Sequence, residues 1–396
     1  MMERRKNLND KFGFVEIMEY TSIGESCSVV SGGTPSRSKN EYWENGNIPW
    51  IKIGNIKSKY VNEYDELITE QGLNNSSAKL LKKGTILYTI FATLGEVGIL
   101  DIEACTNQAI AGINITDPRI TTDYLYYYLK SKKDYVNNIG RGVAQNNINL
   151  TTLKNFEIPL IDVDKQLNIV EILEKVERMI CLKEKEIDDL DLLIKARFIE
   201  MFGDPIVNEK GWRTKPLLDM GQCKNGMNFH YDDKGIDINC LGVCDFKNFS
   251  VIDNTKVLPT VSLNEMPSEE YLLKDDDIVF VRSNGNKALV GRSLVVYPGN
   301  VPTTFSGFCI RYRKYDNEII VPYLLRVLKT DSVRMKMSGR GANIQNLNQQ
   351  ILGTLVIPVP PIELQEQFAD FVQQVDKSRF DIKKSIIELE REVVYD

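Results

Sequence analysis

The chain has 396 residues, of which 42% are hydrophobic and 26% are charged, and its formal net charge is −6. This length is too great for one ordinary core and suits two or three domains, while the composition is globular and disfavours disorder and a disulfide-dense miniprotein. No apolar run approaches the roughly 20 residues of a membrane helix, and no apolar segment follows the charged start, so we expect a cytoplasmic protein.

Residues 1–160 are predicted to form a mixed α/β domain. Strands are expected at Ile48 to Ile53 and Thr85 to Phe91, with a short helix near Tyr124 and Gly-rich turns between them. The domain closes with GRGVAQNNINLTTLKNFEIP, from Gly140 to Pro159. In this segment Asn149 precedes a short helical stretch, which favours a helix N-cap over a contact to a DNA base.

A long helix is predicted over residues 161–203, and Gly203 and Pro205 end it. Its apolar positions are spaced alternately by four and three residues, which is typical of a coiled-coil seam. Lys183 occupies the one missing seam position. The predicted seam consists of Ile169, Leu173, Val176, Ile180, Ile187, Leu190 and Ile194.

Residues 204–360 repeat the first domain. Gly339 to Pro358 reads GRGANIQNLNQQILGTLVIP and aligns without a gap to the segment that starts at Gly140, at an offset of 199 residues. Asn348 matches Asn149 and is predicted to be the same N-cap. LLKDDDIVFV from Leu272 matches LLKKGTILYT from Leu80, and Val290-Gly291 is aligned to Val97-Gly98 after small indels. The repeated unit is therefore a whole domain.

A second long helix is predicted over residues 361–396, with the same seam register and with Arg379 in its one missing position. Because the first helix leads from domain one to domain two and the second starts where domain two ends, a compact chain requires the helices to be antiparallel. The expected fold class is α+β, with two mixed α/β target-recognition domains separated by an antiparallel coiled coil. The second seam consists of Phe368, Val372, Val375, Ile382, Ile386, Leu389 and Val393.

Catalytic and metal-binding motifs are not found. The sequence has no Gly-x4-Gly-Lys-Ser/Thr phosphate loop, and a single His leaves little scope for a metal site or a catalytic triad. Seven cysteines without an export signal indicate reduced thiols. We therefore expect no catalytic residues and no bound metal.

Several short motifs resemble one known family. The stretch SGGTPSRSKNEYWENGNIPWIKI, from Ser31 to Ile53, is similar to the opening of a target-recognition domain in the specificity subunit of Type I restriction-modification enzymes. The resemblance covers essentially the whole chain, including the duplication and both long helices. It includes Gly140-Arg141-Gly142 with Gln145 to Ile148, Ile158-Pro159, Arg197-Phe198 with Met201 to Pro205, and Pro358 to Ile362 with Gln365 and Gln367.

This resemblance implies a non-catalytic subunit that recognises a split double-stranded DNA target, one half in each domain. It implies that the helices set the half-site spacing and dock two modification subunits, through which restriction subunits bind. S-adenosylmethionine, ATP and magnesium would then bind the partner subunits, and no cofactor would bind this chain. The second domain departs from the pattern, with Lys224-Asn225-Gly226-Met227 in place of Gly-Gly-Thr-Pro, and Ile161-Asp162-Val163 stands where Pro-Pro-Leu is expected.

Candidate DNA contacts follow from the duplication, because two domains that read different half-sites share phosphate contacts and differ where bases are read. Arg141 and Arg340 match and can reach phosphate, with a salt bridge to a helix end as the alternative. Polar residues in non-matching loops are candidates for base edges, with an ordinary solvated surface as the alternative. The predicted DNA-binding residues are Ser36, Arg37, Lys39, Lys52, Asn55, Lys57, Arg141, Gln145, Asn146, Arg282, Asn284, Asn286, Lys287, Arg292, Arg340 and Gln345.

Three other functions remain open from sequence. The targeting subunit of a fused methyltransferase-nuclease system would differ only in its partners. A coiled-coil scaffold with protein-binding domains, or a metabolic enzyme with duplicated domains, would belong to another class. A net charge of −6 opposes nucleic-acid binding on average but does not exclude a local basic patch.

Overall fold

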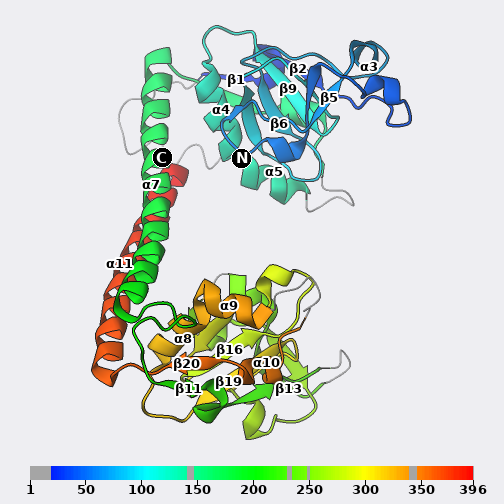
Figure 1. The fold of residues 1–396 in the computed structure, drawn as a ribbon. Coiled ribbons are helices and arrows are strands. Elements are labelled where there is room, and N and C mark those ends of the chain that lie inside the picture. Colours follow the sequence, from blue (N-terminus) through cyan, green and yellow to red (C-terminus); the bar gives the residue numbers. More distant parts are fainter. Residues whose placement is uncertain (1–18, 141–146, 230–233, 248–249, 339–345, 396) are drawn as a thin grey trace. The chain divides into compact units, whose positions relative to one another are not determined.

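The computed structural model describes residues 19–140, 147–229, 234–247, 250–338 and 346–395. The chain divides into two compact units, Met1–Cys181 with Ile387–Asp396, and Leu182–Ile386. Each unit contains one globular domain, called domain 1 and domain 2 below, and a part of each long helix (Figure 1). Within the described ranges, no helix combines the length and the apolar character that a membrane crossing requires.

Domain 1 is built from a five-stranded sheet in the order β2-β9-β6-β7-β4, a three-stranded sheet β5-β3-β8, and the pair β1-β10. Neighbouring strands are antiparallel except in the pairs β3-β8 and β4-β7. The strands are β1 (Glu19–Ser22), β2 (Cys27–Ser31), β3 (Ile48–Ile51), β4 (Tyr60–Val61), β5 (Glu66–Ile68), β6 (Ile86–Thr89), β7 (Val97–Leu100), β8 (Cys105–Thr106), β9 (Ile110–Ile115) and β10 (Glu157–Leu160). The helices are α2 (Ile23–Ser26), η1 (Asn40–Tyr42), η2 (Ile53–Asn55), α3 (Glu70–Asn74), α4 (Thr122–Ser131), α5 (Lys133–Gly140) and α6 (Leu150–Lys154).

The core of domain 1 lies between the five-stranded sheet and α4. Strands β6 and β7 are buried along their whole length, because both of their faces are covered. Leu125 and Leu129 of α4 are fully buried in the same cluster, and the hydroxyl of Tyr124 donates to the Pro159 carbonyl at 2.9 Å. These contacts hold α4 against the sheet and against β10.

Domain 2 repeats this architecture, which confirms the expected duplication of a mixed α/β fold. Its sheets have the orders β12-β19-β16-β17-β14, β15-β13-β18 and β11-β20. The strands are β11 (Thr214–Pro216), β12 (Gly221–Asn225), β13 (Ile236–Leu241), β14 (Val251–Ile252), β15 (Thr260–Leu263), β16 (Asp277–Val281), β17 (Ser293–Val296), β18 (Thr303–Phe305), β19 (Cys309–Lys314) and β20 (Val356–Pro358). The helices are η3 (Leu217–Asp219), η4 (Val243–Lys247), η5 (Thr255–Val257), η6 (Glu269–Tyr271), η7 (Lys287–Leu289), α8 (Val321–Lys329), α9 (Asp331–Ser338) and α10 (Gln349–Gly353).

One detail of the predicted repeat is wrong. The register places Ile86 opposite Ile113 and Ile278 opposite Tyr312, so β6 corresponds to β16 as predicted. Beyond these strands, however, Gly291 corresponds to Gly95 and not to Gly98. Both glycines have positive φ, +79° and +76°, and their N–H groups bond back to Thr89 and Val281, the last residues of β6 and β16.

The error has a simple physical cause. The difference in residue number between equivalent positions grows from 192 at these strands (Ile86 and Ile278) to 196 at the two glycines (Gly95 and Gly291). The loop after β16 is therefore four residues longer than the loop after β6. Loops tolerate such insertions because they lie on the surface. Alignment by residue identity places an insertion of one residue here, since Gly291 lies 193 residues after Gly98 against 192 at the strands, whereas the structure has four.

The two long helices are α7 (Val163–Phe202) and α11 (Ile362–Tyr395). In the first unit, Val170 and Leu173 of α7 pack into the core of domain 1. Ile169, which the heptad pattern places on the seam, is 39% exposed there, because the helix turns Val170 towards the domain instead.

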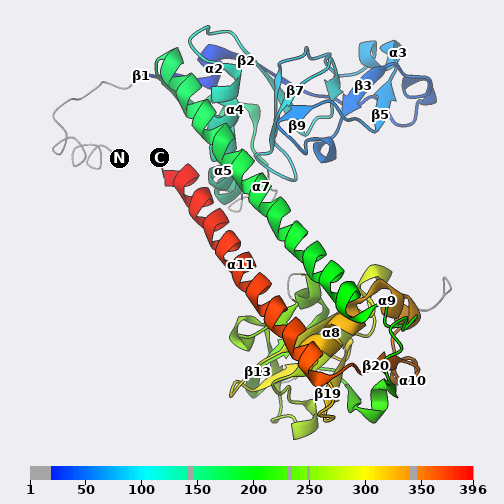
Figure 2. The ribbon, with the colours of Figure 1, turned by 60° about the vertical axis from the view of Figure 1, so that its left-hand side comes forward.

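In the second unit, α7 and α11 lie side by side (Figure 2). The ring centroids of Phe198 and Phe368 are 5.5 Å apart, and Arg379 forms an ion pair with Asp191. Residue numbers rise along α7 as they fall along α11, so the helices are antiparallel here, as expected. Among the predicted seam residues Ile194, Phe368 and Val375 are buried, the side chain of Val393 lies outside the described residues, and the half-buried ones are Leu173, Val176, Ile180, Ile187, Leu190, Val372, Ile382, Ile386 and Leu389.

Each long helix is joined to its own domain by one buried glutamine. Gln166 accepts a hydrogen bond from the Thr121 N–H at 2.9 Å and donates to the carbonyls of Arg119 and Ile161. Gln365 makes the same three bonds, to Ile320, Glu318 and Pro360, at 2.9 to 3.0 Å. All partners shift by 199 residues, so the junction is part of the repeat.

Candidate nucleic-acid interface

In domain 1, the predicted contacts Arg37 and Lys52 are held by acidic neighbours. The Arg37 guanidinium stacks on Trp43, with 3.6 Å between its carbon and the ring centroid, and forms an ion pair with Glu66. Lys52 Nζ lies 2.7 Å from the same carboxylate and 3.5 Å from Asp65. The hydrogen bond from Arg37, with help from Lys52, holds the pKa of Glu66 below its usual range. This cluster is therefore largely neutralised within the domain.

Asn55 has a structural role that the sequence did not reveal. It is only 4% exposed, and its side-chain oxygen accepts from the Lys52 N–H at 2.9 Å while its amide nitrogen donates to Asp65 at 3.2 Å. A side chain whose donor and acceptor are both bonded within a buried turn is not free to read a base. In the structure Asn55 thus holds the turn, contrary to its predicted place among the base contacts.

The other described candidates of domain 1, Ser36, Lys39 and Lys57, are exposed. Lys57 Nζ lies 3.4 Å from Glu63, a surface pair that costs little to break. Lys39 donates to the Tyr42 hydroxyl at 2.9 Å, which is the main reason that the pKa of Lys39 is raised. Ser36 bonds to Ser38. These side chains can exchange their present partners for phosphate oxygens.

In domain 2, the described candidates lie on the long loop after β16. The Asn284 side-chain oxygen accepts from the Asn286 N–H at 2.8 Å, and that of Asn286 accepts from the Ala288 N–H at 3.0 Å. The guanidinium groups of Arg282 and Arg292 donate to main-chain carbonyls, those of Gly307 and Phe246. The loop is thus held by its own amide oxygens, which leaves the Asn284 and Asn286 amide nitrogens without a bond to the described part of the chain.

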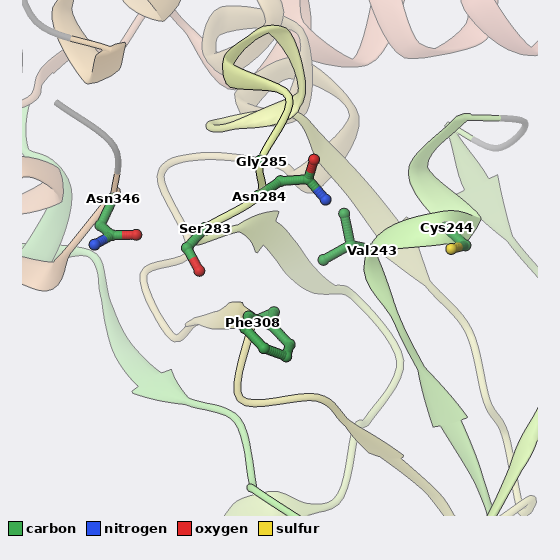
Figure 3. Close-up of a pocket in the computed structure, with 7 residues that line it drawn as sticks. All are labelled: Val243, Cys244, Ser283, Asn284, Gly285, Phe308 and Asn346. Atoms are coloured by element: carbon green, nitrogen blue, oxygen red, sulfur yellow. The ribbon is translucent and has the colours of Figure 1, made fainter. Parts of the chain in front are cut away.

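This loop borders an open hollow of about 570 Å³ in domain 2 (Figure 3). Its lining combines apolar and amide-bearing side chains. Phe308 is 61% exposed, so most of its side chain is open to a ligand at the hollow. Figure 3 shows Asn346 on one side of the hollow, Asn284 and Val243 on the other, and Phe308 below them. The lining residues are Val243, Cys244, Ser283, Asn284, Gly285, Phe308 and Asn346.

The backbone around this hollow is the same in both domains. The Leu347 N–H donates to the Arg282 carbonyl at 2.8 Å, as the Ile148 N–H donates to the Ile90 carbonyl at 3.1 Å. Bridges pair Ser283 with Asn346 and Phe91 with Asn147 in the same way. The hollow is therefore built on a shared frame.

The glycine pattern shows a second shared element. Gly226 occupies the place of Gly32, since a Cβ on either would collide with an equivalent carbonyl oxygen, that of Ser306 or Asn107. The second domain thus keeps the glycine that the geometry needs, although it lacks the Gly-Gly-Thr-Pro motif. This departure from the family pattern does not alter the backbone at Gly226.

The side chains on this frame differ between the domains. The strand registers put Phe308 where domain 1 has Ala109, and Val243 where it has Ile53. Phe308, Val243, Cys244, Ser283 and Asn346 were missing from the predicted contacts. Phe308 stands at a non-matching position of the repeat, as a specificity residue would, but it is apolar and the predicted contacts were polar.

Two asparagines shared by the domains are confirmed as helix caps. Asn149 accepts from the Thr152 N–H at 2.8 Å and Asn348 from the Ile351 N–H at 2.9 Å, at the starts of α6 and α10. The predicted contacts Arg141, Gln145, Asn146, Arg340 and Gln345 lie outside the described residues, as does the side chain of Lys287. Asn147 and Asn346 are the first described residues after 141–146 and 339–345.

Comparison with known proteins matches both halves of the chain to one family. A family model described as the Type I restriction modification DNA specificity domain matches residues 16–192 and again 209–391. The MjaIX specificity subunit of Methanocaldococcus jannaschii is 26% identical over 401 residues, covering 95% of this chain and 90% of that protein. The EcoR124I/EcoR124II specificity subunit of Escherichia coli is 29% identical over 168 residues, or 41% of each chain.

The fold is also similar to that of a solved structure described as showing the structural basis of complex assembly and conformational transition of the type I R-M system. The TM-score is 0.64 at 16% identity, and the alignment covers 97% of each chain. This comparison supports the two-domain fold with long helices.

Proposed function

The chain belongs to the Type I restriction-modification DNA specificity family, whose function is DNA target recognition, and we propose that each of its two domains reads one half of a bipartite target. One observation carries the proposal. The two domains share a backbone frame around the loops after β6 and β16, while the side chains on that frame differ. Two domains that recognise different half-sites are expected to share a backbone frame and to differ in the side chains that contact bases.

The chain is proposed to be non-catalytic and to act in the cytoplasm. Specificity subunits work with modification and restriction subunits. Here two modification subunits would dock on α7 and α11, restriction subunits would join through them, and the helices would set the half-site spacing. S-adenosylmethionine, ATP and magnesium would bind those partners.

Methylation mapping tests this function. The full chain, combined with its modification subunit and S-adenosylmethionine, is expected to methylate one bipartite sequence with a fixed gap. The chain alone is expected neither to methylate nor to cut the same DNA. Methyl transfer by the isolated chain, or methylation without a sequence preference by the complex, would overturn the proposal.

A further inference from the structure

We propose that the hollow of domain 2 takes the major-groove edge of one adenine–thymine pair, with the thymine methyl against Phe308 and Val243 and the adenine edge on Asn346. This inference rests on the proposed function and names what domain 2 reads. It concerns five side chains that line the hollow: Val243, Ser283, Asn284, Phe308 and Asn346.

The size and opening of the hollow suit such a guest. Its volume of about 570 Å³ lies within the range typical of ligand-binding clefts. Phe308 leaves 61% of its surface uncovered at the base of the hollow, beside Val243. A methyl group placed here would be removed from water, which is favourable by about 0.8 kcal/mol.

The amide groups provide the polar part of the recognition. The exposed Asn346 side chain has no hydrogen bond to the part of the chain that the structure describes, so its oxygen and nitrogen can meet adenine N6 and N7 together. The Asn284 oxygen is already used by the Asn286 N–H, which leaves its amide nitrogen to donate. Thymine O4 is the acceptor next to the thymine methyl, and Figure 3 shows Asn284, the donor, on the same side of the hollow as Val243.

The same groups discriminate against other pairs. Cytosine offers an N4 donor where thymine offers O4, and it would meet the Asn284 donor. Guanine offers two acceptors, to which the Asn346 oxygen cannot bond. Domain 1 has Ala109 in place of Phe308 and Phe91 in place of Ser283, so it cannot form this arrangement.

A scan with base analogues tests the inference on the full chain with its modification subunit. After methylation mapping has given the target, each thymine of both half-sites is replaced singly by uracil, which lacks only the methyl group. At one position the wild-type complex is expected to bind about fourfold more weakly, the effect of one buried methyl. The Phe308→Ala complex is expected to bind the thymine and uracil duplexes equally.

A second analogue examines the adenine of the same pair. Replacement by 7-deazaadenine removes the N7 acceptor and is expected to weaken wild-type binding by about fivefold or more, but not binding by Asn346→Ala. Tyr315→Ala serves as the matched control, because Tyr315 is an aromatic residue of domain 2 that is also 61% exposed but does not line the hollow. It should keep the full uracil effect.

The outcomes separate the two proposals. If the complex methylates one sequence but no thymine shows a methyl effect that depends on Phe308, the inference about the hollow is wrong and the recognition function stands. If the effect persists in Phe308→Ala, the methyl group lies elsewhere and the inference is also wrong. If no sequence is methylated at all, the proposed function itself fails.

Discussion

At the scale of single residues, the buried glutamines that join each helix to its domain give a stability prediction. Gln365 is fully buried and bonded to three main-chain groups. Gln365→Ala would leave these groups without partners, and we expect it to lower the free energy of unfolding by about 2 to 4 kcal/mol. Chemical denaturation of the full chain measures this loss.

The control for this experiment is Gln373→Ala, since Gln373 is exposed on the same helix. Its effect should stay within about 0.5 kcal/mol. Similar losses for both variants would mean that helix propensity, and not the buried bonds of Gln365, determines the change.

The two capping asparagines provide a second prediction. Because Asn348 accepts the Ile351 N–H at 2.9 Å, serine can replace it and alanine cannot. Asn348→Ala should cost about 1 kcal/mol of unfolding free energy, whereas Asn348→Ser should keep both the stability and the methylated sequence. A changed target in the serine variant, found by methylation mapping, would assign Asn348 to base reading instead.

Local roles such as these caps could be predicted from sequence, because the partner of Asn149 is the N–H only three residues away. The full role of Asn55 could not, since only its bond to the Lys52 N–H is local and its other bond is to Asp65, ten residues away. Phe308 was missed for a different reason: an exposed apolar side chain has no polar signature. Its position became informative only when the strand register placed it opposite Ala109 in the repeat.

At the scale of elements, α8 carries a lysine whose environment differs from that of its counterpart in the repeat. Burial acts to lower the pKa of Lys130 on α4, but its bond to Glu177 of α7 at 2.5 Å, together with the charges of Tyr126 and Glu177, raises that pKa overall. In the repeat, the counterpart of Glu177 is Asp376 of α11, whose side chain is one methylene shorter. Asp376 pairs with Arg379 at 2.6 Å instead of with the lysine. Burial, with repulsion from Arg326, lowers the pKa of Lys329 to about 8.

This difference predicts a pH dependence of stability. The pKa of Lys329 is about 8 in the folded chain and 10.5 for a free lysine, so between these values the unfolded state binds more protons and stability rises with pH. At about pH 7, Lys329→Met should be more stable than the wild type. Over that pH window its free energy of unfolding should rise less steeply than that of the wild type, and the two slopes should differ by at most about 1.4 kcal/mol per pH unit.

Denaturation of both proteins at about pH 7 and pH 10 measures the effect. Lys336→Met, at an exposed position of α9, should follow the wild-type profile. Parallel profiles for the wild type and Lys329→Met would mean that Lys329 titrates normally.

Long elements were predictable from sequence and short ones were not. The heptad spacing gave both α7 and α11 to within a few residues, and Arg379 in the missing seam position proves to be paired with Asp191 and Asp376. The order of strands of two to six residues depends on pairings between distant segments, which periodicity does not encode.

At the scale of the whole molecule, a net charge of −6 requires that DNA be met by local positive groups. If Arg141 and Arg340 contact phosphate, changing either to Ala should weaken binding to all sequences alike and reduce the salt slope by roughly one. Asn284→Ala should instead change the preferred half-site, by about 1 to 3 kcal/mol. Binding titrations at several salt concentrations distinguish the two, and a sequence-dependent effect of Arg340→Ala would reverse the assignment.

The spacing of the half-sites is the property that the long helices should control. Four residues inserted at matched mid-helix positions of α7 and α11 add about 6 Å, or roughly two base pairs, and turn the helix about 40° beyond a full turn. Two base pairs turn DNA about 70°, and local untwisting can absorb the remaining 30° or so. We therefore expect the same half-sites with a gap one or two base pairs longer.

A seven-residue insertion makes the matched control for this prediction. It adds length equal to about three base pairs but leaves the helix near its original angle, so the rotational mismatch reaches roughly 100° or more. This variant should bind poorly, although its seam register is preserved. Methylation mapping of the four-residue variant decides the question, because an unchanged gap, or altered half-site sequences, would mean that α7 and α11 do not set the spacing.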